Sequence, residues 1–206
     1  MKPVFTLHYL PCIAWFQHAL KFEEIQIEAF ENYQKQTYRT RCRVLSANGV
    51  QVLNIPVKQI SGEKTLISKI QIDEEMDFRK QHWQTLISAY GKSAYFLYYR
   101  DAFEAYFEKE ESTLFEFNLG LVKLVLKCLK LNLTIDSTIE YNKNLPEYLD
   151  YRNRFSAKNL NPKNELLINK KYWQVFEEKF GFTPNLSILD LLFNLGPDAK
   201  SVLKTK

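Results

Sequence analysis

The chain has 206 residues, of which 46% are hydrophobic and 15% aromatic, so it can bury a substantial core and is not expected to be disordered. Its net charge of +4 falls short of the strong basic patch of a nucleic-acid-binding protein, so we expect no nucleic-acid partner. Its cysteines and histidines show neither a CxxC nor an HExxH spacing. We therefore predict no disulfide framework, no metal site and no cofactor.

No segment has the pattern of a signal peptide or a membrane span. The most apolar stretch, residues 119–131, is interrupted by lysines and is too short to cross a bilayer. The sequence thus predicts a cytoplasmic protein. No linker or internal repeat divides it, so residues 1–206 are expected to form one domain, whose oligomeric state stays open.

Strand patterns dominate the first third of the chain. Residues 4–7 predict a short buried strand, residues 12–20 a helix and residues 25–30 a second strand. Together these three segments suggest a βαβ unit. Alternating apolar residues over 66–72 predict a further strand.

The clearest local signal is Asn48-Gly49, which lies between the β-rich runs 40–47 and 50–57. An Asn-Gly pair in this setting predicts a hairpin with a type I′ turn. The pairs expected across this hairpin are Leu45 with Val52 and Ala47 with Val50.

From Asp77 onward the apolar residues recur at helical spacing. The elements expected there are a helix over 77–90 ended by Gly91, a helix over 96–107, a mostly buried helix opened by Ser112, a strand over 133–141, a loop within 146–169, and helices over 172–180 and 186–194. The sequence therefore predicts a mixed α/β fold. A strand-rich N-terminal third with a β-hairpin precedes a mainly helical C-terminal part that packs on the sheet.

Three arginines at alternating positions form a candidate anion site. If residues 39–43 are extended, the side chains of Arg39, Arg41 and Arg43 share one face of the hairpin. Guanidinium groups bind phosphates and carboxylates through paired hydrogen bonds, so this face suits a small anionic molecule. The alternative is a solvated edge whose long side chains cover apolar atoms.

His82 is the candidate general base. It stands beside the apolar stripe of Trp83, Leu86 and Tyr90, which would place it at a rim between helix and sheet. An enzyme that uses His82 should show a limb in its pH–rate profile near the ordinary histidine pKa of about 6.5. The alternative is a packing residue.

Several other polar residues carry two interpretations each. Asp190 shares a helical stripe with Ser187 and Asn194, so it lies either on a solvent face or against a ligand. Tyr9 lies before Pro11 at a predicted strand end, where open α/β sheets bind ligands, and the same holds for the adjacent His8. Cys12 is expected to be buried and inert, because no histidine partner is evident.

The order of several motifs indicates a family. They are His8-Tyr9-Leu10-Pro11-Cys12-Ile13-Ala14-Trp15-Phe16, Tyr38-Arg39-Thr40-Arg41 before Asn48-Gly49, Leu53-Asn54-Ile55-Pro56-Val57, Gln81-His82-Trp83 before Tyr90, and Asn185-Leu186-Ser187-Ile188-Leu189-Asp190. In this order and spacing the chain resembles the WbqC-like protein family over most of its length.

The resemblance implies a glycyl transferase that acts on amino sugars in bacterial surface-polysaccharide (O-antigen) biosynthesis. The residues that match the family's pattern are Tyr9, Pro11, Arg41, His82, Tyr90 and Asp190. The chain departs from this pattern at Thr6 and Leu7, where a Gln-Pro pair is common, at Cys12, where an aromatic is usual, and at Thr40 and Cys42, where asparagines are frequent. These departures leave the substrate open.

The leading hypothesis is a transferase that moves a glycyl, aminoacyl or small acyl group onto an amino sugar, possibly linked to a nucleotide. In this hypothesis the three arginines hold the phosphates or a carboxylate, His82 with Asp190 serves catalysis, and Tyr9 or Tyr90 orients the substrate. One alternative is a non-catalytic binding protein for a sugar nucleotide or another small anion. The other is a protein-interaction module.

Overall fold

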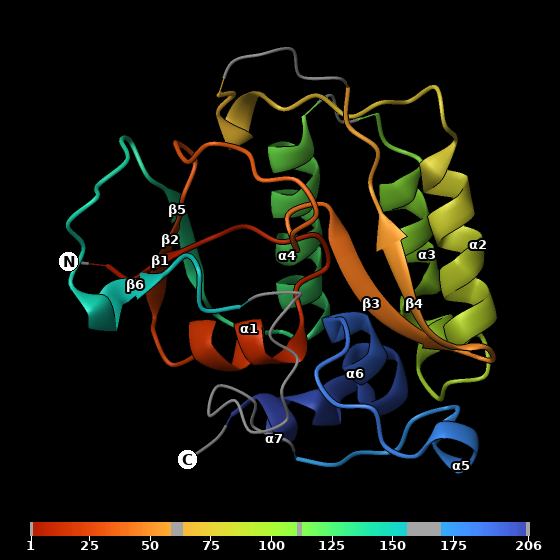
Figure 1. Cartoon of the computed structure of the whole chain (residues 1–206). Helices are drawn as coiled ribbons and strands as arrows, with labels where there is room; N and C mark the ends of the chain where they lie inside the picture. Colours follow the sequence, from red (N-terminus) through yellow and green to blue (C-terminus); the bar gives the residue numbers. More distant parts are fainter. Residues whose placement is uncertain (1, 59–63, 111–112, 156–169, 205–206) are drawn as a thin grey trace.

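A parallel sheet and a separate hairpin make up the β structure of this computed structural model, which describes residues 2–58, 64–110, 113–155 and 170–204. The four strands of the sheet are β1 (Val4–Phe5), β2 (Glu24–Ile27), β5 (Thr134–Ser137) and β6 (Asp150–Tyr151). They lie in the order β5-β2-β1-β6, and each neighbouring pair is parallel. The sheet stands on the left in Figure 1 and the hairpin on the right.

The predicted βαβ unit is confirmed. Helix α1 (Ile13–Ala19) connects β1 to its parallel neighbour β2, and all of its residues are buried. In β2 the side chains of Ile25 and Ile27 are buried, whereas Glu24 is exposed. This strand ends before the predicted residue 30, because the carboxylate of Glu28 turns back to accept a hydrogen bond from the backbone N–H of Phe30.

The hairpin is confirmed, but its predicted turn type and pairing are wrong. Strands β3 (Arg41–Ser46) and β4 (Gly49–Asn54) place Leu45 opposite Val50 instead of Val52. A type I′ turn needs positive φ at both central residues, which here are Ala47 and Asn48. Positive φ occurs instead at Gly49, with a value of 96°.

The reason for the different turn is a local side chain. The hydroxyl of Ser46 donates a hydrogen bond to the carbonyl of Gly49 and accepts one from the N–H of Asn48. These bonds close the turn one residue earlier than the Asn-Gly signal suggests. Each residue of the first strand therefore pairs two residues earlier in the second strand than predicted. A shift by two leaves every side chain on its predicted face.

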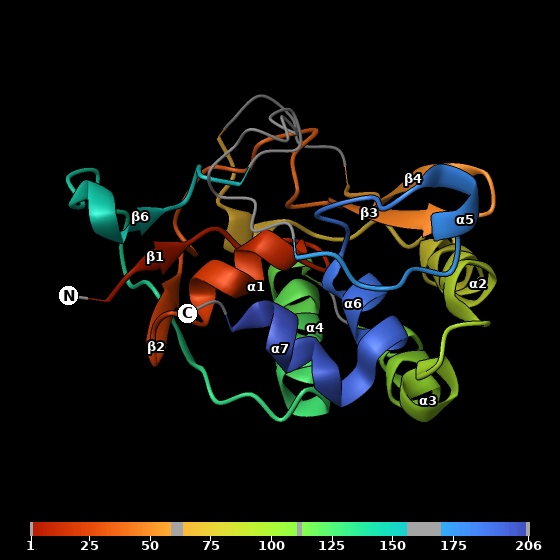
Figure 2. The ribbon, with the colours of Figure 1, turned by 90° about the horizontal axis from the view of Figure 1, so that it is seen from below.

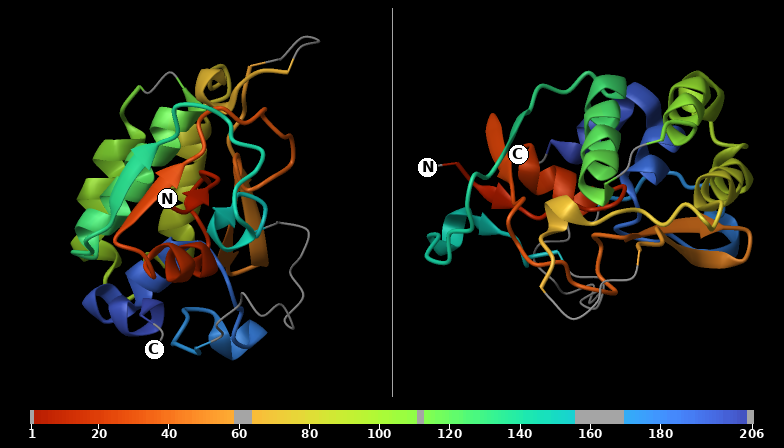
Figure 3. Two further views of the ribbon diagram at one scale, coloured as in Figure 1. Left: turned by 90° about the vertical axis from the view of Figure 1, so that its left-hand side faces the viewer. Right: turned by 90° about the horizontal axis from the view of Figure 1, so that it is seen from above.

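The three predicted central helices are confirmed. They are α2 (Phe78–Tyr90), α3 (Phe96–Phe107) and α4 (Leu114–Cys128). The carboxylate of Asp77 caps α2 and the hydroxyl of Thr113 caps α4, while Ser112 lies outside the described residues. Helix α4 stands between the parallel sheet and the pair α2 and α3 (Figure 1 and Figure 3).

Two strand predictions need correction. Residues 66–72 do not form a strand: a 3-10 helix η1 (Ile67–Lys69) occupies their centre, with single β-bridges on either side. The buried residues Ile67 and Ile70 are three apart, which suits one turn of this helix. The late strand β5 is shorter than predicted and lies at the edge of the sheet.

The C-terminal third contains the largest differences from prediction. The helix expected over 172–180 is reduced to α5 (Glu177–Phe180), because Tyr172 and Gln174 alternate inward in an extended segment. Helix α6 (Ile188–Leu195) is confirmed. The elements that the sequence did not predict are η2 (Glu147–Leu149), β6, η3 (Gly196–Asp198) and α7 (Ala199–Leu203). The remainder of the predicted loop, 156–169, lies outside the described residues.

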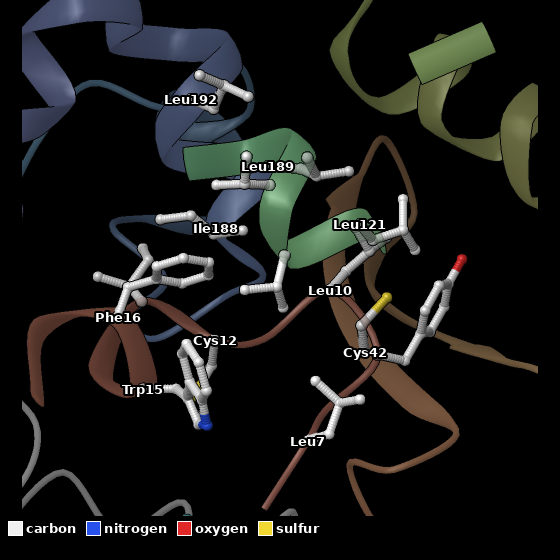
Figure 4. Close-up of a cluster of buried hydrophobic side chains, with 14 of the residues drawn as sticks. Leu7, Leu10, Cys12, Trp15, Phe16, Cys42, Leu121, Ile188, Leu189 and Leu192 are labelled. Atoms are coloured by element: carbon white, nitrogen blue, oxygen red, sulfur yellow. The ribbon is translucent and has the colours of Figure 1, made fainter. Parts of the chain in front are cut away.

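The hydrophobic core is continuous from the sheet to the hairpin. Helix α6 lies at its centre, and helices α1, α6 and α7 pack against one another in Figure 2. Figure 4 shows side chains from the N-terminal segment, β3, α4 and α6 meeting in one cluster, among them Leu10, Cys42, Leu121 and Leu189. The segment around residue 10 and strand β3 are thus held by the same core.

Candidate functional site

Arg41 and Arg43 lie on the outer face of the hairpin. Both are half-buried, and across the hairpin they pair with Asn54 and Val52, which are exposed. The Nε of Arg41 donates a hydrogen bond of 3.2 Å to the side-chain oxygen of Asn54. No carboxylate in the described part of the chain forms an ion pair with either arginine. This face therefore carries two positive charges that are not neutralised by a described side chain.

Arg39 does not share that face. Strand β3 begins only at Arg41, and the side chain of Arg39 turns inward, where it is 4% exposed. Its Nε and Nη2 bind the two carboxylate oxygens of Glu31 at 2.8 and 2.5 Å. The Nη1 atom also donates to the hydroxyl of Thr37. The sequence prediction of three arginines on one face thus holds geometrically for two, because the third is used in a buried ion pair.

His82 is buried inside the molecule and does not lie at a rim. It projects from α2, is 7% exposed, and its Nδ1 lies 2.9 Å from the hydroxyl of Tyr9. The backbone carbonyl of Asn54 lies close enough to the same ring to raise its pKa. Which of the two partners, Tyr9 or Nδ1, donates the hydrogen bond between them depends on the tautomer of His82.

Burial lowers the pKa of His82 to about 4, although the carbonyl of Asn54 acts in the opposite direction. The imidazole is consequently neutral at pH 7. A pH–rate limb caused by this residue would fall near 4 and not near 6.5.

Asp190 is buried on α6, so the solvent-face interpretation is wrong. Its carboxylate accepts hydrogen bonds from the hydroxyl of Tyr172 at 2.5 Å and from the Nε2 of Gln174 at 2.9 Å. Burial raises the pKa of Asp190 to about 6, and these hydrogen bonds lower it in part. The Tyr90 hydroxyl also lies close enough to lower this pKa, but it makes no hydrogen bond of good geometry.

The hairpin separates the two groups of predicted site residues. Along β3 the side chains alternate, so Cys42 points into the core while Arg41 and Arg43 point outward. Cys42 interacts electrostatically with both Tyr9 and Tyr90, which places these tyrosines on the inner side. Asn54 is the connection, since its backbone lies close enough to His82 to raise the pKa of that ring, while its side chain accepts a hydrogen bond from Arg41.

The cysteines show no sign of a reactive thiol. Cys12 and Cys42 are buried, and Cys128 is partly buried. Burial is the largest cause that raises the pKa of each thiol above its usual range, which suppresses the thiolate form. The expectation of a buried Cys12 is confirmed.

A cavity of about 1240 Å³ lies elsewhere, between α2, α3 and the chain around residues 71–77. Its lining is Lys58, Gln71, Ile72, Asp73, Glu74, Glu75, Asp77, Arg79, Lys80, Trp83, Gln84, Glu104, Phe107, Glu108 and Glu110. Carboxylates outnumber cations in this lining, so the cavity does not suit the anion expected from the sequence.

The sequence did not single out Tyr38, Asn54, Tyr172 or Gln174, which the structure places beside the predicted residues. Tyr38 and Asn54 belong to motifs that carry the family resemblance, so a signal for these two was present. Among the residues with coordinates described above, no cluster of histidine, cysteine or carboxylate side chains could hold a metal ion. Likewise, none of the described helices is long and apolar enough to cross a membrane.

Comparison with known proteins gives the family. The sequence profile of the WbqC-like protein family matches residues 7–160 and 143–202. The chain is also 25% identical to the uncharacterized protein Rv1507c of Mycobacterium tuberculosis, over 96% of this chain and 94% of that protein. No solved structure matches the chain. Because the two profile matches together cover most of the sequence, the chain belongs to the WbqC-like protein family.

Proposed function

We propose that the chain binds a small anionic molecule of the nucleotide-sugar class on the outer face of the hairpin. We further propose that this binding serves the transfer of a glycyl or small acyl group to the amine of the sugar. The observation that carries the first part is the pair Arg41 and Arg43, which share one face without a described carboxylate partner. The second part rests on the family resemblance.

Several features of the outer face favour an anion. A guanidinium group presents a planar set of donors that fits two oxygens of a phosphate or carboxylate. Both arginines are partly shielded from water, which strengthens an interaction with a bound anion relative to full exposure. The exposed side chain of Val52 offers an apolar surface beside Arg43. A ligand with a charged part and a larger neutral part would contact the arginines with the first and Val52 with the second.

In the proposed transfer the sugar amine attacks the carbonyl carbon of an activated glycyl or acyl donor. A C–N bond forms, the leaving group departs with the electron pair of its bond to the carbonyl carbon, and the proton released by the amine passes to that leaving group or to water. His82 is a weak base on the other side of the hairpin. We therefore assign it a positioning role, in which it holds Asn54 and, through that side chain, Arg41.

Ligand binding is tested by thermal unfolding of the purified chain with uridine diphosphate N-acetylglucosamine and with inorganic phosphate. A ligand at 100 times its dissociation constant adds about 2.7 kcal/mol of apparent stability. We expect stabilisation by the nucleotide sugar, weakened roughly 10- to 100-fold in affinity by Arg41→Ala or Arg43→Ala, because each change removes charge-assisted hydrogen bonds.

The matched control is Arg100→Ala, which removes the same charge from α3. Equal weakening by Arg100→Ala would show a general charge effect and contradict the proposed site. The absence of any stabilisation by either probe would contradict anion binding.

The second candidate function is anion binding without transfer. The burial and low pKa of His82 favour it, because the outer face then lacks an evident base. Mass spectrometry of a nucleotide-linked amino sugar incubated with the chain and an activated glycine distinguishes the two. A glycylated product that disappears in Arg43→Ala supports transfer, and stable binding without product supports the second candidate.

A further inference from the structure

Two buried polar atoms near the arginine face lack a hydrogen-bond partner of good geometry among the described residues. The Nδ1 of His8 and the hydroxyl of Tyr38 are both enclosed, and neither accepts or donates a hydrogen bond of good geometry. Their residues are 2% and 5% exposed, and their rings lie 5.4 Å apart. Native proteins rarely keep such atoms unpaired, because burial removes the hydrogen bonds to water without replacing them. Two such atoms on neighbouring rings therefore call for a functional explanation.

The topology of the sheet places His8 where α/β proteins bind ligands. The chain passes from β1 to β2 and β5 on one side, whereas β6 lies on the other side of β1. The order of the strands thus reverses between β1 and β6, and ligands bind outside the carboxyl ends of strands at such a point. His8 follows β1, and Phe155, which follows β6, has its ring 6.4 Å from that of His8.

This place is continuous with the outer face of the hairpin. The guanidinium of Arg43 lies close enough to the Tyr38 hydroxyl to lower its pKa, while burial, the larger effect, raises that pKa to about 12. Burial likewise lowers the pKa of His8 to about 3, and the charge of Arg39 adds to this effect. Both groups are therefore neutral at pH 7. A neutral donor and acceptor pair does not attract an anion but matches a hydroxyl group, which both donates and accepts.

We propose that His8 and Tyr38 form a neutral subsite beside Arg43 that binds a hydroxyl of a sugar ring, so that the ligand class is a sugar phosphate and not a bare anion. This inference rests on the proposed anion site at Arg41 and Arg43. Both polar atoms are enclosed in the free chain. The sugar reaches them when the Arg43 side chain shifts toward a bound phosphate.

The test compares glucose 1-phosphate with inorganic phosphate by isothermal titration calorimetry. Phosphate probes the arginines alone, whereas glucose 1-phosphate probes the arginines and the subsite together. In the unmodified chain we expect glucose 1-phosphate to bind at least tenfold more tightly. Tyr38→Phe removes only the hydroxyl, so the affinity for glucose 1-phosphate should fall about tenfold, in line with the loss of one hydrogen bond. The affinity for phosphate should not change.

Thermal unfolding of the same variant separates a binding role from a structural one. Because the Tyr38 hydroxyl makes no hydrogen bond of good geometry to a described residue and only a weak interaction with Arg43, Tyr38→Phe should change the melting temperature of the free chain little. The matched control is Tyr106→Phe, whose hydroxyl donates to the carbonyl of Phe117 at 3.0 Å. This control should lower the melting temperature and leave both affinities unchanged.

A second readout follows His8 directly. In the ¹⁵N-labelled chain, the Nδ1 resonance of His8 should move when glucose 1-phosphate binds and stay in place with phosphate. If glucose 1-phosphate binds no more tightly than phosphate, or Tyr38→Phe changes neither affinity, the subsite is wrong while the anion site stands. If neither probe binds, the anion site and the subsite both fail.

Discussion

The two faces of the hairpin are built from alternating residues of the same strand, yet they have opposite properties. On the inner face Cys42 and Val44 are buried in the core, and burial shifts the pKa of His82 down to about 4 and that of Asp190 up to about 6. On the outer face Arg41 and Arg43 keep their charges next to exposed Val52. The difference teaches that alternate residues of one strand can serve the core on one face and leave unneutralised charge on the other, which is the face where we propose that a charged ligand binds.

The largest expected effect is on the free energy of unfolding, and it should distinguish Arg39 from Arg41. Arg39→Ala leaves the carboxylate of Glu31 buried without its partner, which should lower the free energy of unfolding by about 3–5 kcal/mol. Arg41→Ala removes only a partly exposed hydrogen bond and should cost about 1 kcal/mol or less. Chemical denaturation measures both values, and equal costs would show that Arg39 is not the structural member of the pair.

The next effect is a loss of stability in acid. The pKa of His82 is about 4 in the folded chain and about 6.5 when unfolded, so the unfolded state binds more protons between these values. Its contribution to stability is present above pH 6.5 and is lost as the pH falls toward 4, by about 3 kcal/mol. His8 should likewise lower the stability as the pH falls, because burial lowers its pKa to about 3 in the folded chain.

Denaturation at a series of pH values checks this prediction with His82→Gln, whose side chain does not titrate. The variant should lose less stability than the unmodified chain between pH 6.5 and 4. An unchanged slope would mean that His82 is protonated in the folded chain, contrary to its burial.

Asp190 should change the stability in the opposite direction to His82 as the pH rises, and by a slightly smaller amount. Its pKa is raised from 3.8 to about 6, so the folded state binds more protons than the unfolded state in this range. The chain should therefore lose about 2–3 kcal/mol from this residue as the pH rises from 4 to 6. Asp190→Asn removes the titration, so stability in this variant should rise more steeply with pH than in the unmodified chain. The same steepness in both chains would contradict the raised pKa.

Sequence patterns predicted those parts of the fold that depend on neighbouring residues. The alternation of Arg41 and Arg43 along the first strand of the hairpin, the start of a helix near Asp77 and its end at Gly91 all concern contacts within one or two elements, and the structure confirms each. The extended segment before α5 was missed because its conformation depends on bonds from Tyr172 and Gln174 to Asp190, which is 16 or more positions away.

The residues of the candidate site also fall into those placed by local patterns and those placed by contacts between distant parts of the chain. The alternation that brings Arg41 and Arg43 together is local, and the sequence predicted it. The pairing of Arg39 with Glu31 depends on the path of the connection before β3, which no periodicity encodes. The contact of His82 with Tyr9 spans 73 positions and requires the packing of α2 against the hairpin. Burial, and with it each pKa shift, follows from such packing.

The smallest expected effect on stability concerns the turn of the hairpin, which fixes the pairing register of β3 and β4. Gly49 has a φ of 96°, which a residue with a Cβ adopts only with strain, so Gly49→Ala should cost about 1 kcal/mol. Asn48 does not have a positive φ, so Asn48→Ala should cost clearly less. A type I′ turn would instead make both positions sensitive, because it needs positive φ at both central residues. Denaturation of the two variants therefore tests the pairing of Arg43 with Val52, which decides what stands beside the proposed anion on the outer face.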